Sequence, residues 1–342
     1  MKLQRSFLLS AAVAFSAGFA SAGTLTYTCD PGIATATCSY LNSTIAGQYN
    51  GTFTNASANI YIQYGSTGLA QTVSAYNFIS YSAYAAYLTT NASDALQSSA
   101  VSSLSNTVAP YGTGNVEITA ALGTAIGVSG LYGVNAAGTS ACSLGDAGCY
   151  NASVTITNNP GTPLYYDNIG GPEASNAYDF YAAVEHETDE VLGTSSCIST
   201  PGGTLTDGCG GGTPSAVDLF RYNSAGSLAV NSSYTGLSGA PSGAYFSYDG
   251  GTTNGANSFV YNTNANGADY ADFLNNCPAG PLSVQDAYGC PGVDAGLSIL
   301  NDGGAEVNIL NAVGYDLAAP EPGTMALFGL GLTAIALYRR RA

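Results

Sequence analysis

The sequence is very poor in histidine, and this limits the metal sites that one chain can form. His186 is the only histidine among 342 residues. A zinc site made from two or three histidines of a single chain is therefore excluded. Any metal bound by one chain would combine His186 with oxygen ligands, and such a set favours harder ions such as manganese, iron or calcium over zinc.

Basic residues are almost as scarce. Five of the six lie at the ends of the chain, and between residues 23 and 319 the only one is Arg221, against 21 acidic residues and a formal charge of −20. So acidic a surface repels nucleic acid and anionic lipid, and neither is expected as a partner. We expect Arg221 to be buried beside an acid rather than to take part in catalysis.

The N-terminal segment has the pattern of a signal peptide. Lys2 and Arg5 are followed by an apolar run, Phe7–Phe19, and by the small residues Ala20–Ala22. This order predicts an export signal over residues 1–22, with a mature chain that starts near Gly23. A buried N-terminal helix is the alternative.

The C-terminal segment carries a second targeting pattern. Pro320-Glu321-Pro322 precedes an apolar run at 324–338 and the basic cluster Arg339–Arg341. The run is shorter than the roughly 20 residues of a full membrane span, and the arginines are expected to stay on the cytoplasmic side. This tail, residues 320–342, resembles the PEP-CTERM sorting signal of Gram-negative bacteria. A plain single-span anchor is the alternative.

The sorting-signal resemblance has consequences for location and partners. It implies export, anchoring in the inner membrane through segment 324–338, and recognition by an exosortase-type sorting machinery. After processing, the protein would reach the cell surface or the extracellular medium. Residues 23–319 would then form the exported domain, which is long enough for one large core or for two lobes about a cleft.

All eight cysteines lie in this exported segment, in four close pairs. An even number in an exported chain indicates disulfide bonds. Each pair brackets a loop rich in glycine or proline, which favours bonds between neighbours, although other connectivities remain open. A structural zinc site is disfavoured because no C-x-x-C spacing occurs. The expected pairs are Cys29–Cys38, Cys142–Cys149, Cys197–Cys209 and Cys277–Cys290.

Hydrophobic periodicity predicts both helices and strands. The expected strands are 59–64, 152–157, 164–166, 216–222 and 244–248. The expected helices are 94–104, 177–192 and 306–313. Segment 79–88 is expected to begin as a strand and continue as a helix, and 116–122 fits either state. No regular element is assigned to residues 23–55, where Cys29 and Cys38 are expected in a loop.

The predicted helix 177–192 contains His186 within a run of acids and ends at Gly193. Its apolar stripe consists of Phe180, Val184 and Val191. Glu187 falls on the same stripe, and His186 and Glu190 stack beside it because they are four residues apart. We therefore expect Glu187 to face a cleft or the core together with His186. A solvated, charged helix face is the alternative.

The pattern H-E-x-x-E at 186–190 has the spacing of a metal site. In H-E-x-x-H, two histidines one turn apart hold zinc and the glutamate activates water. Glu190 stands at the second ligand position here, and a carboxylate can bind zinc at about 2.0–2.2 Å. The candidate ligands are His186, Glu190 and a third oxygen ligand, for which we expect Asp218. Glu187 is the candidate general base.

The pattern continues through Gly193 and Ser196. The resulting H-E-x-x-E-x-x-G-x-x-S resembles the metzincin frame H-E-x-x-H-x-x-G-x-x-H with its second and third ligands changed. The order of elements over roughly residues 55–318, with 164–166 as an edge strand, also resembles secreted zincin-like metalloproteases. The metzincin Met-turn is absent, because Met1 and Met325 are the only methionines.

The zincin resemblance implies a fold and an activity. The fold would be α+β, with a twisted mixed sheet packed on an active-site helix and a loop-rich C-terminal subdomain stapled by disulfides. The activity would be hydrolysis of polypeptides with one divalent metal, zinc or a harder ion. A degenerate scaffold without catalysis, serving at the cell surface or in the extracellular matrix, is the alternative. A Ser/His/Asp triad is disfavoured because no G-x-S-x-G motif occurs.

Overall fold

The structure is a computed structural model, and it describes residues 23–104, 114–166, 174–198, 213–229, 243–257, 259–261, 269–274, 277, 283–293 and 304–318. Nearly all of them belong to one unit, Ala22–Leu317. The predicted signal peptide 1–22 and the apolar segment 324–338 lie outside the described residues. Across the described ranges, no helix is both long and apolar enough to cross a membrane.

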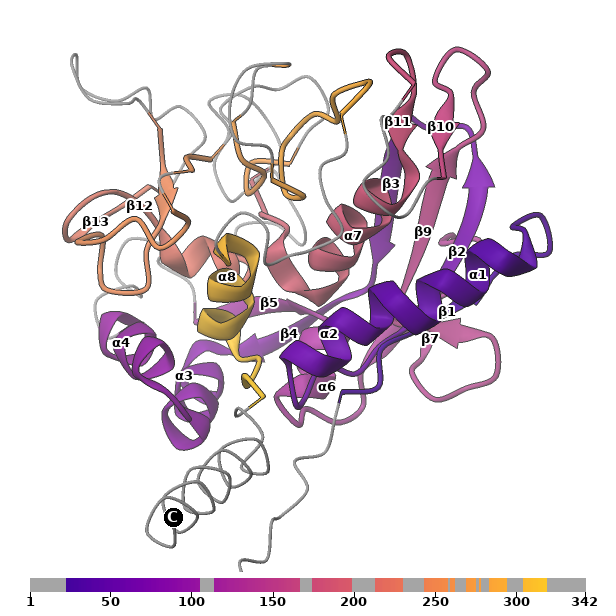
Figure 1. Cartoon of the computed structure of the whole chain (residues 1–342). Coiled ribbons are helices and arrows are strands. Elements are labelled where there is room, and N and C mark those ends of the chain that lie inside the picture. The colour runs from indigo at the N-terminus through magenta and orange to yellow at the C-terminus, as the bar shows by residue number, and fades with distance from the viewer. Residues whose placement is uncertain are drawn as a thin grey trace, which may run out of the picture. The chain divides into compact units, whose positions relative to one another are not determined.

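The main sheet has four strands in the order β1–β2–β9–β3 (Figure 1). They are β1 (Thr26–Cys29), β2 (Asn59–Gly65), β9 (Ala152–Thr157) and β3 (Ala70–Ser74). β1, β2 and β9 run parallel, whereas β3 is antiparallel to β9. The isoleucine and valine side chains of β2 and β9 are buried, and each stabilises the fold by roughly 1.5–3 kcal/mol. The predicted α+β fold with a mixed sheet is confirmed.

The edge of this sheet differs from the prediction. Strands at 59–64 and 152–157 are confirmed, but segment 164–166 is not the edge strand. Leu164–Tyr165 (β10) instead pairs in parallel with Tyr178–Asp179 (β11) in a separate two-stranded sheet. The edge strand on this side of the sheet is β3. Most of its side chains are only half-buried, so its sequence Ala-Gln-Thr-Val-Ser shows little alternation of apolar and polar residues and did not predict a strand.

The N-terminal segment is more regular than its composition indicates. Residues 23–55 form β1, α1 (Thr35–Tyr40), the π-helical turn η1 (Leu41–Ile45) and α2 (Ala46–Thr52). Asn42 binds the backbone of Tyr27 in β1 through both amide atoms, at 2.9 and 3.0 Å, and Asn50 binds Leu25 in the same way at 2.7 and 3.1 Å. The polar composition of this segment indicated a loop, but Asn42 and Asn50 instead form hydrogen bonds with the backbone at the edge strand β1.

A second group of elements follows the sheet. It contains β4 (Tyr76–Ser80), α3 (Tyr81–Asn91), α4 (Ala95–Leu104), β5 (Asn115–Thr119), α6 (Ala120–Ala125) and α8 (Ala305–Val313). The strand-to-helix change at 79–88 and the helices at 94–104 and 306–313 are confirmed. Segment 116–122 is both strand and helix, because Thr119 ends β5 and its hydroxyl accepts from Leu122 N at 3.1 Å.

The remaining strands are short. They are β6 (Tyr132–Asn135), β7 (Ala141–Ser143), β8 (Cys149–Tyr150), β12 (Arg221–Ser224), β13 (Ser227–Leu228) and β14 (Tyr245–Phe246). The strand predicted at 216–222 is wrong in its first half, where Val217–Phe220 forms a 3-10 turn, η3. The Asp218 carboxylate closes this turn by accepting hydrogen bonds from the Ser215 amide and hydroxyl.

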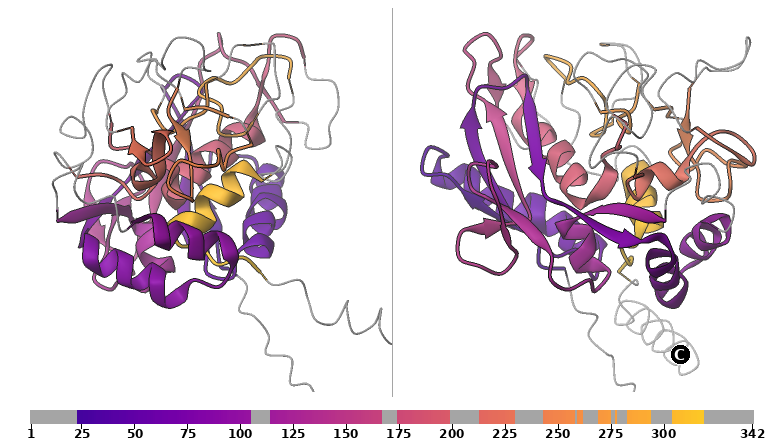
Figure 2. Two further views of the ribbon diagram at one scale, coloured as in Figure 1. Left: turned by 90° about the vertical axis from the view of Figure 1, so that its left-hand side faces the viewer. Right: turned by 180° about the vertical axis from the view of Figure 1, so that it is seen from behind.

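The helix α7 (Phe180–Asp189) packs against β3 and β9. Views from other sides place it between the main sheet and the later elements that include β12 and α8 (Figure 2). The π-helical turn that follows it, η2 (Glu190–Thr194), contacts β3, β5, α6 and α8. The helix with the H-E-x-x-E pattern is therefore central to the fold.

Three predicted disulfide bonds are confirmed: Cys29–Cys38, Cys142–Cys149 and Cys277–Cys290. Cys197 is also disulfide-bonded, and Cys209 lies outside the described residues. None of the described cysteines is free. Thiolate ligation of zinc by these residues is therefore excluded.

Arg221 is buried, as predicted, with 1% of its surface exposed. Its guanidinium donates to the backbone carbonyl of Tyr270 and lies 4.8 Å from the centre of the Tyr261 ring. A cation over an aromatic face is attracted by the ring quadrupole, and the attraction grows when water is excluded. The acidic partner that we expected for Arg221 stays a prediction.

Gly193 offers a test of how α7 ends. Its φ of 118° is unfavourable for a residue with a Cβ, so Gly193→Ala should lower the free energy of unfolding by roughly 1–2 kcal/mol. Gly47, exposed within α2 with open space around it, is the matched control, and Gly47→Ala should raise the free energy by about 0.5–1 kcal/mol. Urea unfolding measures both, and a Gly193→Ala protein as stable as wild type would contradict the expectation.

Candidate metal centre

The local sequence explains where α7 begins and ends. Asp179 caps the first turn, because its Oδ1 accepts from Tyr181 N at 2.8 Å and from Ala182 N at 3.1 Å. The helix continues into η2, and the left-handed backbone of Gly193 ends it as predicted. Glu190 thus stands at the start of a π-type turn, a feature found frequently at functional sites.

The acids of α7 are buried rather than solvated. Glu185, Glu187 and Asp189 are each at most 4% exposed, so the charged-face alternative is wrong. Asp189 points to the N-terminal helices, where the Tyr49 hydroxyl donates to its Oδ1 at 2.8 Å. Glu187 points to the edge strand β3, where the Thr72 hydroxyl donates to its Oε2 at 2.6 Å. The apolar stripe Phe180, Val184 and Val191 is fully buried, as predicted.

A pocket of about 970 Å³ lies along α7 and the edge strand β3. This volume is in the range of ligand sites in proteins. His186, Glu187 and Glu190 line it from one side, and segment 283–293 together with Asp269 and Asp272 lines another. The expectation that Glu187 faces a cleft together with His186 is confirmed.

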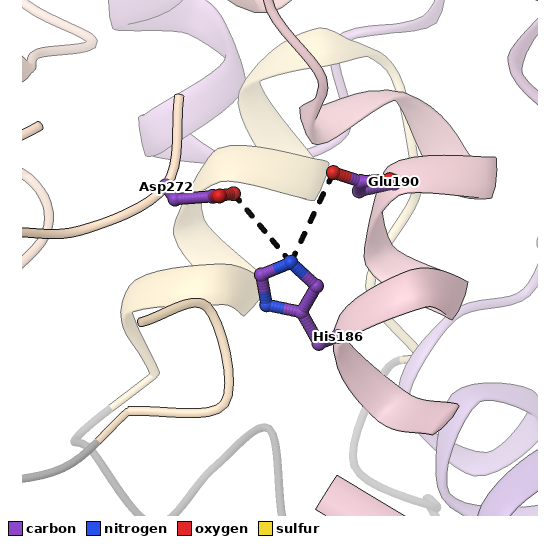
Figure 3. A group of neighbouring side chains, drawn as sticks. All are labelled: His186, Glu190 and Asp272. Carbon is purple, nitrogen blue, oxygen red and sulfur yellow. Dashed lines mark ion pairs between the residues drawn. The ribbon is translucent and has the colours of Figure 1, made fainter. Parts of the chain in front are cut away.

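Three side chains converge in this pocket (Figure 3). Nε2 of His186 lies 3.9 Å from Oε1 of Glu190 and 3.6 Å from Oδ1 of Asp272. One ligand atom from each residue lies within 4.8 Å of the other two. Atoms that each bind one ion at about 2.0–2.6 Å lie roughly 3–4 Å from one another, so the spacing fits a single cation.

Asp272, not Asp218, is the third member of this group. Asp218 is 1% exposed, and its carboxylate accepts from the Ser196 hydroxyl at 2.6 Å and from Cys197 N at 2.9 Å. These contacts join segment 196–197 to η3, and among the described residues Asp218 is not part of the group whose ligand atoms converge with His186, so the prediction of Asp218 as a ligand is wrong. Asp272 lies in a segment without regular structure, and its short spacing from Asp269 was the only sequence signal for it.

The His186 ring has a defined orientation. Its Nδ1 lies 2.9 Å from the backbone oxygen of Val284. A carbonyl oxygen can only accept, so Nδ1 carries a proton, and whenever the ring is neutral its Nε2 presents a lone pair to Glu190 and Asp272. This is the tautomer that a metal ligand requires, and it is assigned from the hydrogen bond.

The carboxyl groups of the pocket are crowded and poorly solvated. Burial raises the pKa of Glu190 well above its usual range, and the neighbouring charges of Glu187 and Asp272 raise it further. Burial also raises the pKa of Asp272 to about 7 and that of Asp269 well above its usual range. Burial raises the pKa of Glu187, although the charge of His186 opposes this.

This crowding indicates which ligand fits the pocket. Burial and the neighbouring charges of Glu187 and Asp272 favour the protonated form of Glu190. A divalent cation would take the place of such a proton, because it stabilises the ionised carboxylates. The donor set of one imidazole nitrogen and carboxylate oxygens therefore fits zinc or a harder divalent ion.

The tautomer of His186 is directly measurable, because the chain has one histidine. In metal-free protein labelled with ¹⁵N-histidine, NMR at a pH where the ring is neutral should show the proton on Nδ1. We expect this because the Val284 carbonyl oxygen lies 2.9 Å from Nδ1 and can only accept a hydrogen bond. A ring protonated mainly at Nε2 would instead mean that His186 donates to Glu190 or Asp272, and it would contradict the assignment.

Comparison with known proteins identifies the C-terminal segment. Residues 318–341 match the family model of the PEP-CTERM protein-sorting motif. The match confirms the predicted sorting signal and implies that the protein is exported and recognised by exosortase sorting machinery. No curated protein and no solved structure matches the chain. The zincin resemblance and the peptidase activity therefore stay predictions, and what is shown is an exported α+β protein with a PEP-CTERM sorting signal.

Proposed function

We propose that this exported protein is a metal-dependent hydrolase of peptide bonds. In this proposal, His186, Glu190 and Asp272 bind one divalent cation, and Glu187 is the general base. The observation that carries it is the convergence of the His186 Nε2 and two carboxylates in one pocket, at distances of 3.6 and 3.9 Å.

Two of the three ligands are held in place by other groups. His186 is held by the Val284 carbonyl. Asp272 accepts from Gln285 Nε2 at 2.8 Å through Oδ1 and from the Asp269 backbone amide at 2.9 Å through Oδ2. Groups that orient metal ligands in this way increase affinity, because less freedom is lost when the ion binds.

The chemistry follows from the position of Glu187. When bound, a divalent cation polarises a peptide carbonyl and lowers the pKa of a water molecule. Glu187 takes the proton of that water and delivers it to the leaving amine. The Thr72 hydroxyl holds Oε2 of Glu187.

The edge strand supports a polypeptide as the substrate. β3 ends the strand order of the main sheet, and its residues Ala70–Thr72 line the pocket. An extended peptide can add to such an edge through main-chain hydrogen bonds. Thr72 belongs to this edge and also contacts Glu187, so a peptide paired with β3 would pass beside the general base.

A non-catalytic protein of the cell surface or extracellular matrix is the second candidate. The observation that favours it is that the Glu187 carboxyl is 4% exposed and accepts a hydrogen bond from the Thr72 hydroxyl at 2.6 Å. A buried carboxyl held in this way can complete an ion site that only stabilises the fold. The two candidates share the metal site and differ in whether Glu187 exchanges protons with water.

Substitution of Glu187 separates the two candidates. Glu187→Gln keeps the acceptor for Thr72 but cannot take a proton, so casein cleavage should fall by about 10²–10⁴-fold while the metal stays bound. Asp146→Asn changes an exposed acid outside the pocket, and it should leave cleavage unchanged. Bound metal without cleavage in the wild type would support the second candidate and contradict the first.

The identity of the third ligand is tested by a matched pair of variants. Asp272→Asn should reduce the metal content of the purified protein well below one ion per chain, as should His186→Ala, because each removes a proposed ligand. Asp218→Asn should leave the metal content unchanged and lower the stability, because it weakens a buried turn. Elemental analysis and thermal unfolding give the two readouts. Loss of metal in Asp218→Asn but not in Asp272→Asn would reverse the assignment.

A further inference from the structure

One short turn, Ser283–Asp286, contacts two of the three proposed ligands. The Val284 carbonyl accepts from His186 Nδ1 at 2.9 Å, and the side chain of the next residue, Gln285, donates to Asp272 Oδ1 at 2.8 Å. His186 lies on α7 and Asp272 in the segment 269–274, so the turn joins two ligands that are far apart in sequence. We propose that this turn positions both ligands and that Glu306 of α8 holds the turn. The proposal rests on the metal site proposed above.

The contacts of Glu306 provide the anchor. Its Oε1 accepts from the Ser283 hydroxyl and from Gln285 N, the latter at 3.2 Å. Asp286 closes the turn by accepting from Ser283 N at 3.1 Å through Oδ2. Glu306 is fully buried, so water does not compete for these hydrogen bonds. The orientation of the Val284 carbonyl therefore depends on a residue of α8.

Gln285 also links the turn to the third ligand. Its Oε1 accepts from the Thr194 hydroxyl at 3.4 Å, at the end of the turn η2 that begins with Glu190. Gln285 has no exposed surface, so its amide cannot exchange these partners for water. A single amide thus fixes the Asp272 carboxylate relative to the turn that carries Glu190.

The covalent structure limits the movement of the turn. The disulfide Cys277–Cys290 closes a loop that contains residues 283–286. Such a bond reduces the conformations open to the loop before the site forms. Gln285 and Glu306 act through other residues, since neither is among the three converging side chains, and they are positioning residues rather than catalytic ones.

Gln285→Leu is the central test, with Gln97→Leu as the matched control. Gln97 is also a buried glutamine, and its Nε2 donates to the carbonyls of Asn311 in α8 and of Tyr315, but its hydrogen bonds do not reach any of the three proposed ligands. In calorimetric titration of the purified full chain with Mn²⁺, Gln285→Leu should weaken binding by about 10–100-fold. Gln97→Leu should lower the melting temperature and leave Mn²⁺ affinity unchanged.

Substitutions at Glu306 test the anchor without metal. In metal-free protein labelled with ¹⁵N-histidine, Glu306→Leu should reduce the fraction of His186 protonated at Nδ1, because the Val284 carbonyl is no longer held in place. Glu306→Gln should restore the wild-type spectrum, since its amide oxygen can accept the same hydrogen bonds. If Glu306→Leu does not fold, Ser283→Ala removes one contact of the anchor and should shift the tautomer in the same direction.

The outcomes distinguish this proposal from the function on which it rests. A wild-type chain that binds no Mn²⁺ but shows the tautomer shift would contradict the metal site and support the positioning by the turn. Unchanged Mn²⁺ affinity in Gln285→Leu, or a His186 tautomer that does not respond to the anchor variants, would overturn the proposal. An equal loss of affinity in Gln97→Leu would also overturn it, because the effect would then be one of general stability.

Discussion

The hydrogen bond from His186 Nδ1 to the Val284 carbonyl is the contact on which the candidate site depends. Without it, the neutral ring could carry its proton on Nε2 and donate a hydrogen bond to Asp272 or Glu190. With it, the Nε2 lone pair of the neutral ring points to both carboxylates and the group takes the form of a ligand set. The backbone carbonyl of Val284, about 100 residues away in sequence, thus determines which nitrogen of the only imidazole carries the proton.

The fold holds several poorly solvated acids close together in the pocket, although their negative charges repel one another. Ionised carboxylates in a poorly solvated pocket are costly, and this cost appears as the raised pKa of Glu190, Asp269 and Asp272. Other contacts of α7, such as the hydrogen bond from the Tyr49 hydroxyl to Asp189 Oδ1, keep this helix in place. The fold therefore holds the pocket acids close together through stable packing elsewhere along the same helix.

Local patterns in the sequence predicted some parts of the structure and could not predict others. The strands β2 and β9 and the direction of Glu187 follow from periodicity, because alternation and helical spacing reflect burial directly. The prediction missed the strand β1, although buried Leu25 and Tyr27 alternate with threonines there, because the polar composition of residues 23–55 as a whole indicated a loop. Asp272 reaches the pocket through an irregular segment, and only the three-dimensional path of the chain brings it to His186.

The burial of Arg221 affects which proteases and chemical reagents can react with the exported segment. Between residues 23 and 319 the sequence has no lysine and no other arginine, and Arg221 itself is enclosed. Proteases that cleave after basic residues find no accessible bond in this folded segment, and amine-directed cross-linkers find no lysine in it. The basic cluster Arg339–Arg341 lies in the sorting tail. An enzyme of that specificity could therefore trim the tail and leave the folded segment whole.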